Sequence, residues 1–297
     1  MTIIETKKLT TYYGKSRGIE DVDICVKEGE IYGFVGPNGA GKSTLMRTLL
    51  NFIRPREGQA FIFGLDCKKE SKKIKESLGY VPGEIKYYPN ISVREHLDYA
   101  ASFKKEGSKD QIDAMMRLLG LEGDKKFYQL SLGNKKKVAL AQAFLGDPKL
   151  LILDEPTGGL DPLLQRIFTD LLLDFKAKGK TVFLSSHNLK EVAHLCDRAS
   201  IIKDGSIVDS MDLKGMENEF GWIVSLKGEL PREALEELSS EVYSSDKGTS
   251  RFLYKGKMDN LIRCLSLFNI EDLNIKKEDI EDRFLRYYGG DNEHLQI

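Results

Sequence analysis

The sequence predicts an α/β fold with a mostly parallel sheet and flanking helices, followed by a smaller α+β domain. Along most of the 297-residue chain, apolar runs of strand length alternate with segments of helical periodicity. This alternation is typical of a parallel sheet that is covered on both faces. After about residue 215 the alternation changes to a different order of short elements. We therefore expect two domains, residues 1–215 and 216–297.

In the first domain the elements follow from hydrophobic periodicity and from residues that stop helices. Short strands are expected between residues 3 and 35, and Pro55 ends a helix over 42–52. Residues 71–128 are expected to be mainly helical. The remaining predicted elements are strands over 59–63, 149–153, 181–185 and 199–203 and helices over 162–178 and 188–196.

In the second domain the predicted order is strand, helix, strand, strand, helix, strand. The strands are expected at 222–226, 242–243, 252–254 and 270–275, and the helices at 231–238 and 258–268. This order is compatible with a ferredoxin-like split motif. A last helix is expected to carry the apolar residues Ile280, Phe284, Leu285 and Tyr288.

Composition limits the classes of function. Lys and Arg number 45 against 46 Asp and Glu, so no overall basic charge favours a nucleic-acid partner. The four cysteines and four histidines form no CxxC or HExxH pattern, which favours reduced thiols over a disulfide or metal site. No uncharged apolar run approaches the ~20 residues that cross a bilayer. We therefore expect a cytoplasmic chain whose membrane role requires a separate partner.

The stretch GPNGAGKST, residues 36–44, fits the pattern GxxxxGK[ST] between an apolar strand and a helix. Glycines let the backbone wrap a phosphate so that amide groups and the helix N-terminus face the anion. Lys42 adds a positive charge near the outer phosphates, and the Ser43 hydroxyl can ligate Mg²⁺.

Two further segments supply candidate catalytic groups. The apolar strand LLILDEP ends in Asp154 and Glu155, and His187 follows the strand TVFLSS. Ligands gather at the carboxyl ends of parallel strands, so these side chains are expected at one edge of the sheet. One carboxylate can face a metal and the other a water beyond the γ-phosphate.

The ordered motifs GPNGAGKST, LSLGN, LLILDEP, GGLDP and SSH resemble the ATP-binding cassette of ABC transporters over about residues 1–210. The resemblance implies a P-loop NTPase fold with an antiparallel β subdomain and a helical subdomain at about 84–147. It also implies ATPase activity with ATP and Mg²⁺.

The resemblance assigns a role to each matching residue. Lys42, Glu155 and His187 are the expected catalytic residues, with Glu155 as general base and His187 on the γ-phosphate. Ser43 and Asp154 are expected at the metal. The expected ATP-binding residues are Tyr13, Gly36, Pro37, Asn38, Gly39, Ala40, Gly41, Lys42, Ser43 and Thr44. Tyr13 would stack on adenine, with Tyr12 as the nearby alternative, and Asp161 would lie in the loop that crosses a dimer interface.

Members of this family pair head to tail, so that the signature segment of one copy faces ATP held by the other. Ser131, Leu132, Gly133 and Asn134 align with the usual LSGGQ, Leu132 replacing the first glycine and Asn134 the glutamine. If the backbone requires a positive φ at Leu132, this side chain is disfavoured. A second departure follows Val-Pro, where Gly83 and Glu84 stand in place of the family's glutamine.

The resemblance implies a homodimer that drives an integral-membrane permease on a separate chain, so the subunit is expected at the inner face of the cell membrane. These variants look like bacterial drug- and antibiotic-export cassettes with an extra C-terminal domain. Tyr87 and Tyr88 are candidates either for the permease contact or for packing within the helical subdomain.

The sequence is less consistent with two other classes of protein. The first is a soluble cassette ATPase that acts on nucleic acid or ribosomes; residues 45–130 lack the sustained heptads of DNA-maintenance relatives, and only one cassette is present. The second is an unrelated kinase or GTPase, and no NKxD-like guanine motif occurs in the sequence.

Overall fold

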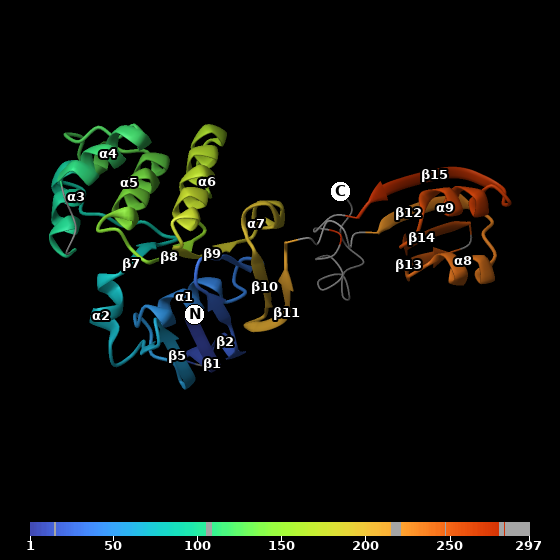
Figure 1. Ribbon diagram of the computed structural model, residues 1–297, viewed down its shortest axis with the longest axis horizontal. Coiled ribbons are helices and arrows are strands. Elements are labelled where there is room, and N and C mark those ends of the chain that lie inside the picture. The colour runs from blue at the N-terminus through green and yellow to red at the C-terminus, as the bar shows by residue number, and fades with distance from the viewer. Residues whose placement is uncertain (15, 105–108, 215–220, 247, 279–281, 283–297) are drawn as a thin grey trace. The chain divides into compact units, whose positions relative to one another are not determined.

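The chain folds as two compact units, Met1–Leu213 and Lys214–Ile297 (Figure 1). The computed structural model describes residues 1–14, 16–104, 109–214, 221–246, 248–278 and 282. Within these ranges no helix is both long enough and apolar enough to cross a membrane. Ile280, Phe284, Leu285 and Tyr288 of the expected last helix lie outside the described residues.

The first unit is built around a six-stranded sheet in the order β11-β10-β4-β9-β8-β7. Its strands are β4 (Ile31–Val35), β7 (Leu78–Val81), β8 (Leu150–Asp154), β9 (Thr181–Ser186), β10 (Arg198–Lys203) and β11 (Ser206–Asp212). All neighbours pair in parallel except β11, which pairs antiparallel with β10. Every residue of β4, β8 and β9 is buried, which explains their nearly continuous apolar sequences.

β7 corrects the expectation that residues 71–128 are mainly helical. The strand has four residues and contains Gly79, so it gives no clear periodic signal. It exists because it pairs with β8 and packs closely under a helix from later in the chain. A Cβ atom on Gly79 would lie 2.0 Å from the carbonyl oxygen of Ala143 in that helix. The edge strand β11 was also missed, because its residues are mostly half-exposed.

Helices cover both faces of this sheet (Figure 1). α1 (Lys42–Leu49) lies on one side, and α5 (Leu132–Phe144), α6 (Pro162–Ala177) and α7 (Leu189–Leu195) lie on the other. α1 ends before the expected residue 52 because Asn51 adopts a left-handed backbone with φ 57°.

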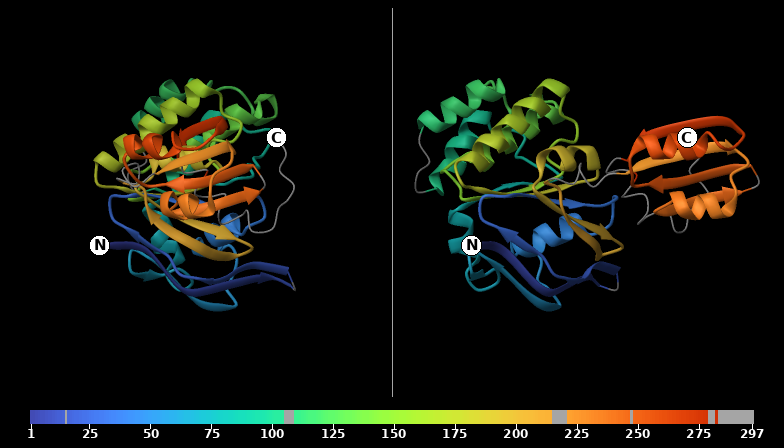
Figure 2. Two further views of the ribbon diagram at one scale, coloured as in Figure 1. Left: turned by 90° about the vertical axis from the view of Figure 1, so that its right-hand side faces the viewer. Right: turned by 45° about the vertical axis from the view of Figure 1, so that its right-hand side comes forward.

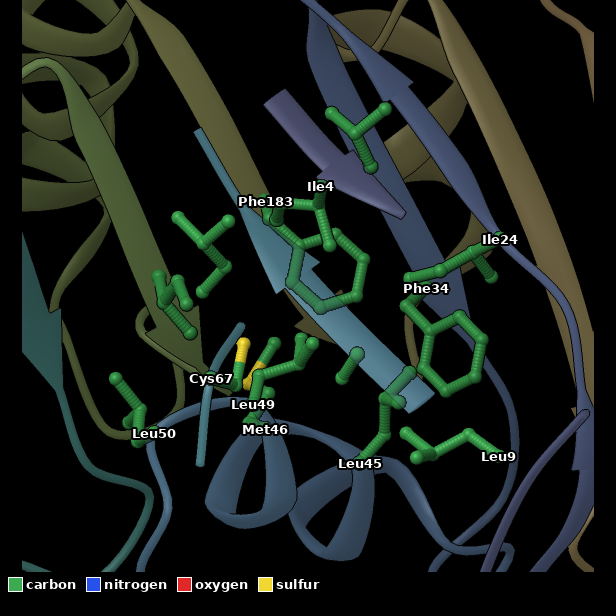
Figure 3. Packing of buried hydrophobic residues seen from close by; sticks show 14 of the residues in the cluster. Ile4, Leu9, Ile24, Phe34, Leu45, Met46, Leu49, Leu50, Cys67 and Phe183 are labelled. Carbon is green, nitrogen blue, oxygen red and sulfur yellow. The ribbon is translucent and has the colours of Figure 1, made fainter. Parts of the chain in front are cut away.

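A second, antiparallel sheet packs against the far side of α1. It consists of β1 (Thr2–Tyr13), β2 (Ser16–Val22), β3 (Cys25–Lys27), β5 (Glu57–Ile62) and β6 (Leu65–Asp66). Figure 3 shows the core between the two sheets, where Leu45, Met46 and Leu49 of α1 meet Phe34 and Phe183 from the parallel sheet. Ile4 and Leu9 close this core from the antiparallel sheet. The phosphate-loop helix is thus fixed on both sides.

Short helices occupy most of the chain between β6 and β8. They are α2 (Ser71–Glu76), α3 (Val93–Ser102), α4 (Lys109–Leu119), the 3₁₀ turn η1 (Phe127–Gln129) and α5. A capping box starts α3: the Ser92 hydroxyl accepts from the Glu95 amide, and the Glu95 carboxylate accepts from the Ser92 amide. α3 and α4 each pack against α5, which joins this helical layer to the parallel sheet.

The second unit has the expected ferredoxin-like connectivity (Figure 2). Its elements are β12 (Trp222–Gly228), α8 (Arg232–Leu238), β13 (Glu241–Asp246), β14 (Thr249–Tyr254), α9 (Met258–Leu265) and β15 (Ile270–Lys277). The four strands form an antiparallel sheet in the order β13-β14-β12-β15. Both helices contribute to one core, Leu235 from α8 and Leu261 from α9 packing with Val224 and Phe252 of the sheet.

Candidate functional site

Four chain segments with polar or glycine residues meet at the carboxyl edge of the parallel sheet. β4 leads into Gly36, β8 ends at Asp154 and Glu155, β9 is followed by His187, and β7 is followed by Gly83. Because β4, β9, β8 and β7 are consecutive parallel neighbours, these segments emerge side by side. A cavity of about 470 Å³ opens there, lined by residues of the phosphate loop together with Tyr13, Gly83, Glu84, Asp154 and Glu155.

The phosphate loop has a backbone that requires glycine at defined positions. Gly39 and Gly41 have φ values of 82° and 111°, a region that side chains disfavour. A Cβ atom on Gly36 would lie 2.3 Å from the Ile202 carbonyl oxygen. α1 begins directly afterwards at Lys42, so its N-terminal amides and positive dipole end face the cavity. The loop has the form of an anion-binding site.

Lys42 and Glu155 form the charged centre of the cavity. The Lys42 side chain is 4% exposed; its ammonium donates to the carbonyl oxygens of Gly36 and Pro37 at 2.7 and 3.0 Å and lies 3.1 Å from Glu155 Oε1. His187 Nδ1 lies 3.3 Å from Glu155 Oε2. Burial raises the pKa of the Glu155 carboxyl, but the hydrogen bond and charge of Lys42, assisted by His187, outweigh burial and lower it below its usual value.

Ser185 on β9 holds the Asp154 carboxylate and the Glu155 main chain. Ser185 Oγ donates to Asp154 Oδ1 at 2.7 Å and accepts from the Glu155 amide at 3.0 Å. Asp154 is buried, whereas the Glu155 side chain is 30% exposed. The backbone of Glu155 is left-handed, with φ 46°, and such a conformation in a residue with a side chain costs free energy and often occurs at functional sites. The two carboxylates thus differ in both burial and direction.

The aromatic residue at the cavity is Tyr13, which lines it, and the Thr44 hydroxyl lies 3.5 Å from the Tyr13 hydroxyl. Tyr12 is engaged elsewhere: its hydroxyl donates to Glu20 at 3.0 Å, and Arg56 lies over its ring. Of the two neighbouring tyrosines, Tyr13 is therefore the one at the cavity.

Sequence reasoning missed Arg17 and Arg47, which also line the cavity. Neither belongs to a motif: Arg17 lies in the antiparallel strand β2 and Arg47 in the last turn of α1. The one signal in the sequence was the spacing of Arg47, four residues after Ser43 and so about one helical turn beyond the phosphate loop. Both guanidinium groups add positive charge beside the phosphate loop.

The segment with the unusual glycine lies against the buried carboxylate. A Cβ atom on Gly83 would lie 3.1 Å from Asp154 Oδ2. Glu84 lines the same cavity, but its side chain is 67% exposed and pairs with Lys86 at 2.9 Å. Glycine therefore leaves space beside Asp154, and Glu84 directs its charge toward Lys86.

The signature segment begins α5, and none of its residues lines this cavity. Ser131 is the N-cap, its hydroxyl accepting from the amide of Asn134 at 3.3 Å. Leu132 is the first helical residue, has no positive φ, and exposes 61% of its side chain. A Cβ atom on Gly133 would meet only the Gly159 carbonyl oxygen, at 3.5 Å. Leucine at position 132 is therefore compatible with the backbone, which answers the question raised by the sequence.

The loop after β8 carries Asp161 to the start of α6. The Asp161 carboxylate accepts from the amide of Leu164 at 2.9 Å and is the N-cap of that helix, with Pro162 in the first turn. The side chain is exposed. Ser131 and Asp161 thus both cap helices on the exposed surface of the chain, outside the phosphate cavity.

A parallel sheet with this loop, paired carboxylates and a histidine at one edge is the arrangement of the P-loop nucleoside triphosphatase fold of the cassette type. The ABC transporter family model matches residues 19–158. An uncharacterized ABC transporter ATP-binding protein of Bacillus subtilis, YhcH, is 33% identical and is covered over 99% of both chains. The chain therefore belongs to the ATP-binding proteins of the ABC transporter family.

Two further comparisons cover about seven tenths of the chain. The bacitracin transport ATP-binding protein BcrA of Bacillus licheniformis is 39% identical over 71% of this chain and 70% of its own length. A dimeric structure of the ATP-binding cassette MJ0796, in a post-hydrolysis state with ADP and Pi, superimposes with a TM-score of 0.66. That structure is 25% identical and covers 72% of this chain and 100% of its own.

Proposed function

We propose that this chain hydrolyses ATP between two head-to-tail copies of itself and drives a separate membrane permease of a bacterial exporter. The observation that carries the proposal is the position of Glu155. One of its carboxylate oxygens contacts Lys42, which follows the phosphate loop, and the other contacts His187. The name of the bacitracin-transport relative supports the export of a drug or antibiotic. We place the chain at the cytoplasmic face of the membrane, held by its permease.

In this proposal residues 36–44 bind the triphosphate and Tyr13 stacks on the adenine. Lys42 holds the outer phosphates, whose oxygens compete with Glu155 for the same ammonium group. Glu155 accepts the proton of the attacking water, because its lowered pKa keeps it charged at neutral pH. The water oxygen bonds to the γ-phosphorus, the bond to the bridging oxygen breaks, and ADP leaves. His187 donates to the γ-phosphate oxygens.

The residues present fit a bound Mg²⁺. Ser43 and Asp154 line one cavity and offer a hydroxyl and a carboxylate, the hard oxygen donors that this cation prefers. Ser185 donates a hydrogen bond to Asp154 Oδ1 and so holds this carboxylate in place. When bound there, Mg²⁺ supplies charge neutralisation to the phosphates.

The pairing of two copies follows from the position of the signature segment. Ser131 accepts a hydrogen bond from Asn134 and has its own O–H to donate, at the N-terminus of a thirteen-residue helix. Such a terminus favours an anion, which we propose is the γ-phosphate held by the partner. Asp161, an exposed residue two positions after the Gly159 that lies near Gly133, is the proposed interface residue. The dimeric cassette with ADP and Pi supports this arrangement.

We place the permease contact in a groove of about 790 Å³ between α2, β7, α3 and α5. Three exposed aromatic side chains line it, Phe52, Tyr99 and Phe103, and Lys72 and Lys75 lie at its side. This composition favours an amphipathic helix of the permease with apolar and acidic side chains. Tyr87 instead packs between His96 and Phe127 of the helical layer, while Tyr88 is 79% exposed outside the groove.

The proposal is tested with the purified chain and with membranes that contain its permease. We expect Mg²⁺-dependent release of phosphate from ATP, abolished in Lys42→Ala, and co-purification with one membrane protein. Tyr99→Asp should weaken that co-purification, and Tyr128→Asp, at a similarly exposed tyrosine outside the groove, is the matched control. A chain without ATPase activity that binds no membrane protein would contradict the proposal, as would salt-dependent binding of RNA or DNA at low micromolar concentration.

A further inference from the structure

Lys136 belongs to the run of three lysines after the signature segment, a run that by itself resembles a solvated helix face. Its side chain is nevertheless buried, with 6% exposed. The ammonium donates to the main-chain carbonyl oxygen of Glu155 at 3.1 Å. The neighbours Lys135 and Lys137 are half-buried. One lysine of the three therefore points inward, and its partner is the backbone of the proposed general base.

This contact completes a clamp on the Glu155 peptide groups. The Glu155 amide donates to Ser185 Oγ on β9, and its carbonyl accepts from Lys136 on α5. The residue between these two anchors has the left-handed φ of 46°, a conformation that persists only where the surroundings hold it. The clamp thereby sets the direction in which the carboxylate leaves the chain, toward Lys42 and His187.

The Lys136 ammonium lies in a buried, partly acidic environment. Burial lowers the pKa of Lys136, and the charges of Glu155, Asp154 and Glu191 act in the opposite direction. A Cβ atom on Gly158 would lie 3.2 Å from Nζ, so the loop after Glu155 closes over this group. Further along the loop, the Gly159 carbonyl oxygen lies against Gly133 of the signature segment. The start of α5 and the loop after Glu155 therefore touch at two places.

Lys136 and the signature serine share one rigid element. Ser131 caps α5 and Lys136 follows five residues later, a rise of about 7.5 Å along the helix. A helix turn is stiff compared with a loop, so a displacement of the N-terminus of α5 is transmitted to Lys136. The clamp on Glu155 moves with it.

We propose that Lys136 is a positioning residue that orients the Glu155 side chain of its own ATP site. This orientation depends on whether Ser131–Asn134 of the same chain binds the γ-phosphate of the ATP that the partner copy holds. The inference rests on the proposed function, since it requires two ATP sites in a head-to-tail pair. It links the two sites through this chain: ATP in the partner's phosphate loop docks on α5, and α5 orients the general base for the ATP in this chain's loop.

The test compares Lys136→Met, which keeps the length of the side chain and removes the donor, with Lys136→Arg, which restores it. Lys135→Met on the same helix is the matched control. We expect Lys136→Met to lower kcat about 10- to 100-fold, because small misplacements of a reacting group have effects of this size. KM should change less than about threefold because the phosphate loop is untouched, and the Hill coefficient for ATP should fall toward 1. Lys136→Arg should recover most of kcat.

Two results would overturn the inference. One is a Lys136→Met variant with wild-type kcat and Hill coefficient. The other is a Lys136→Met variant in which ATP affinity and melting temperature fall together with kcat, and in which Lys136→Arg recovers none of the three. That is the behaviour of a lysine that only fills the core. In both cases wild-type hydrolysis leaves the proposed function intact. A wild-type chain that does not hydrolyse ATP refutes the proposed function itself, and the inference with it.

Discussion

The two units of the chain use similar elements but differ in the direction of their strands. In the first unit, β4, β9, β8 and β7 are parallel, so all four carboxyl ends lie at one edge. In the second unit all neighbouring strands are antiparallel, and their carboxyl ends alternate between the two edges. Both units have a buried apolar core. Strand direction, more than core packing, determines where polar side chains from distant segments can gather.

The sharpest test of this comparison removes the proposed base from the first unit. Glu155→Gln keeps the size and hydrogen-bonding ability of the side chain but cannot accept a proton. We expect kcat to fall 10²- to 10⁴-fold with ATP binding retained, as is usual for a lost general base. Steady-state phosphate release and calorimetric ATP binding measure the two quantities. Glu122→Gln, at an exposed carboxylate on the helical layer, is the control, and a retained kcat in Glu155→Gln would refute the role of Glu155.

The next test disrupts each core in turn. Phe183 and Phe252 are both fully buried, one in each unit. Truncation of such a side chain to alanine costs about 3–5 kcal/mol of folding free energy. We expect Phe183→Ala to abolish ATP binding at 37 °C, and Phe252→Ala to unfold the second unit at a lower temperature while basal ATPase activity changes less than about threefold. Calorimetric melting with and without ATP measures both. Loss of ATP binding in Phe252→Ala would show that the units are not separable.

A smaller effect is expected at the signature serine. Ser131→Ala removes an N-cap worth about 1 kcal/mol and a donor to the partner's phosphate worth about as much. ATP-dependent dimerisation should weaken about 5- to 20-fold. Ser92→Ala is the matched control, because it removes the cap of α3 with its capping box but no proposed phosphate contact. Equal weakening in both variants, measured by analytical ultracentrifugation, would reduce the role of Ser131 to helix stability.

The smallest effect is expected at the residue where the signature departs most from its family. Leu132 has an ordinary helical backbone and an exposed side chain. Glycine there costs the helix up to about 1 kcal/mol and gains no conformational freedom that the site needs. Leu132→Gly should therefore change ATP-dependent dimerisation less than about threefold. An increase of tenfold or more would show that leucine hinders the signature contact.

Local motifs made the phosphate edge predictable from the sequence, because Asp154 ends an apolar strand, His187 directly follows one, and Lys42 completes the glycine-rich motif after another. The ferredoxin-like connectivity of the second unit also followed from the order of its elements. β7 did not, because four residues with a central glycine become a strand only by pairing with β8. The burial of Lys136 was unpredictable for the same reason. Nothing in the sequence distinguishes the three consecutive lysines, and only the tertiary contact with Glu155 and the loop after it buries one of them.

The most direct test of the paired site is the molar mass of Glu155→Gln in solution, measured by light scattering with saturating nucleotide. With ATP and Mg²⁺ we expect twice the mass of one chain, and with ADP the mass of a single chain. The same sample should show bound ATP by calorimetry. A Glu155→Gln chain that binds ATP and keeps the mass of one chain would contradict the head-to-tail site.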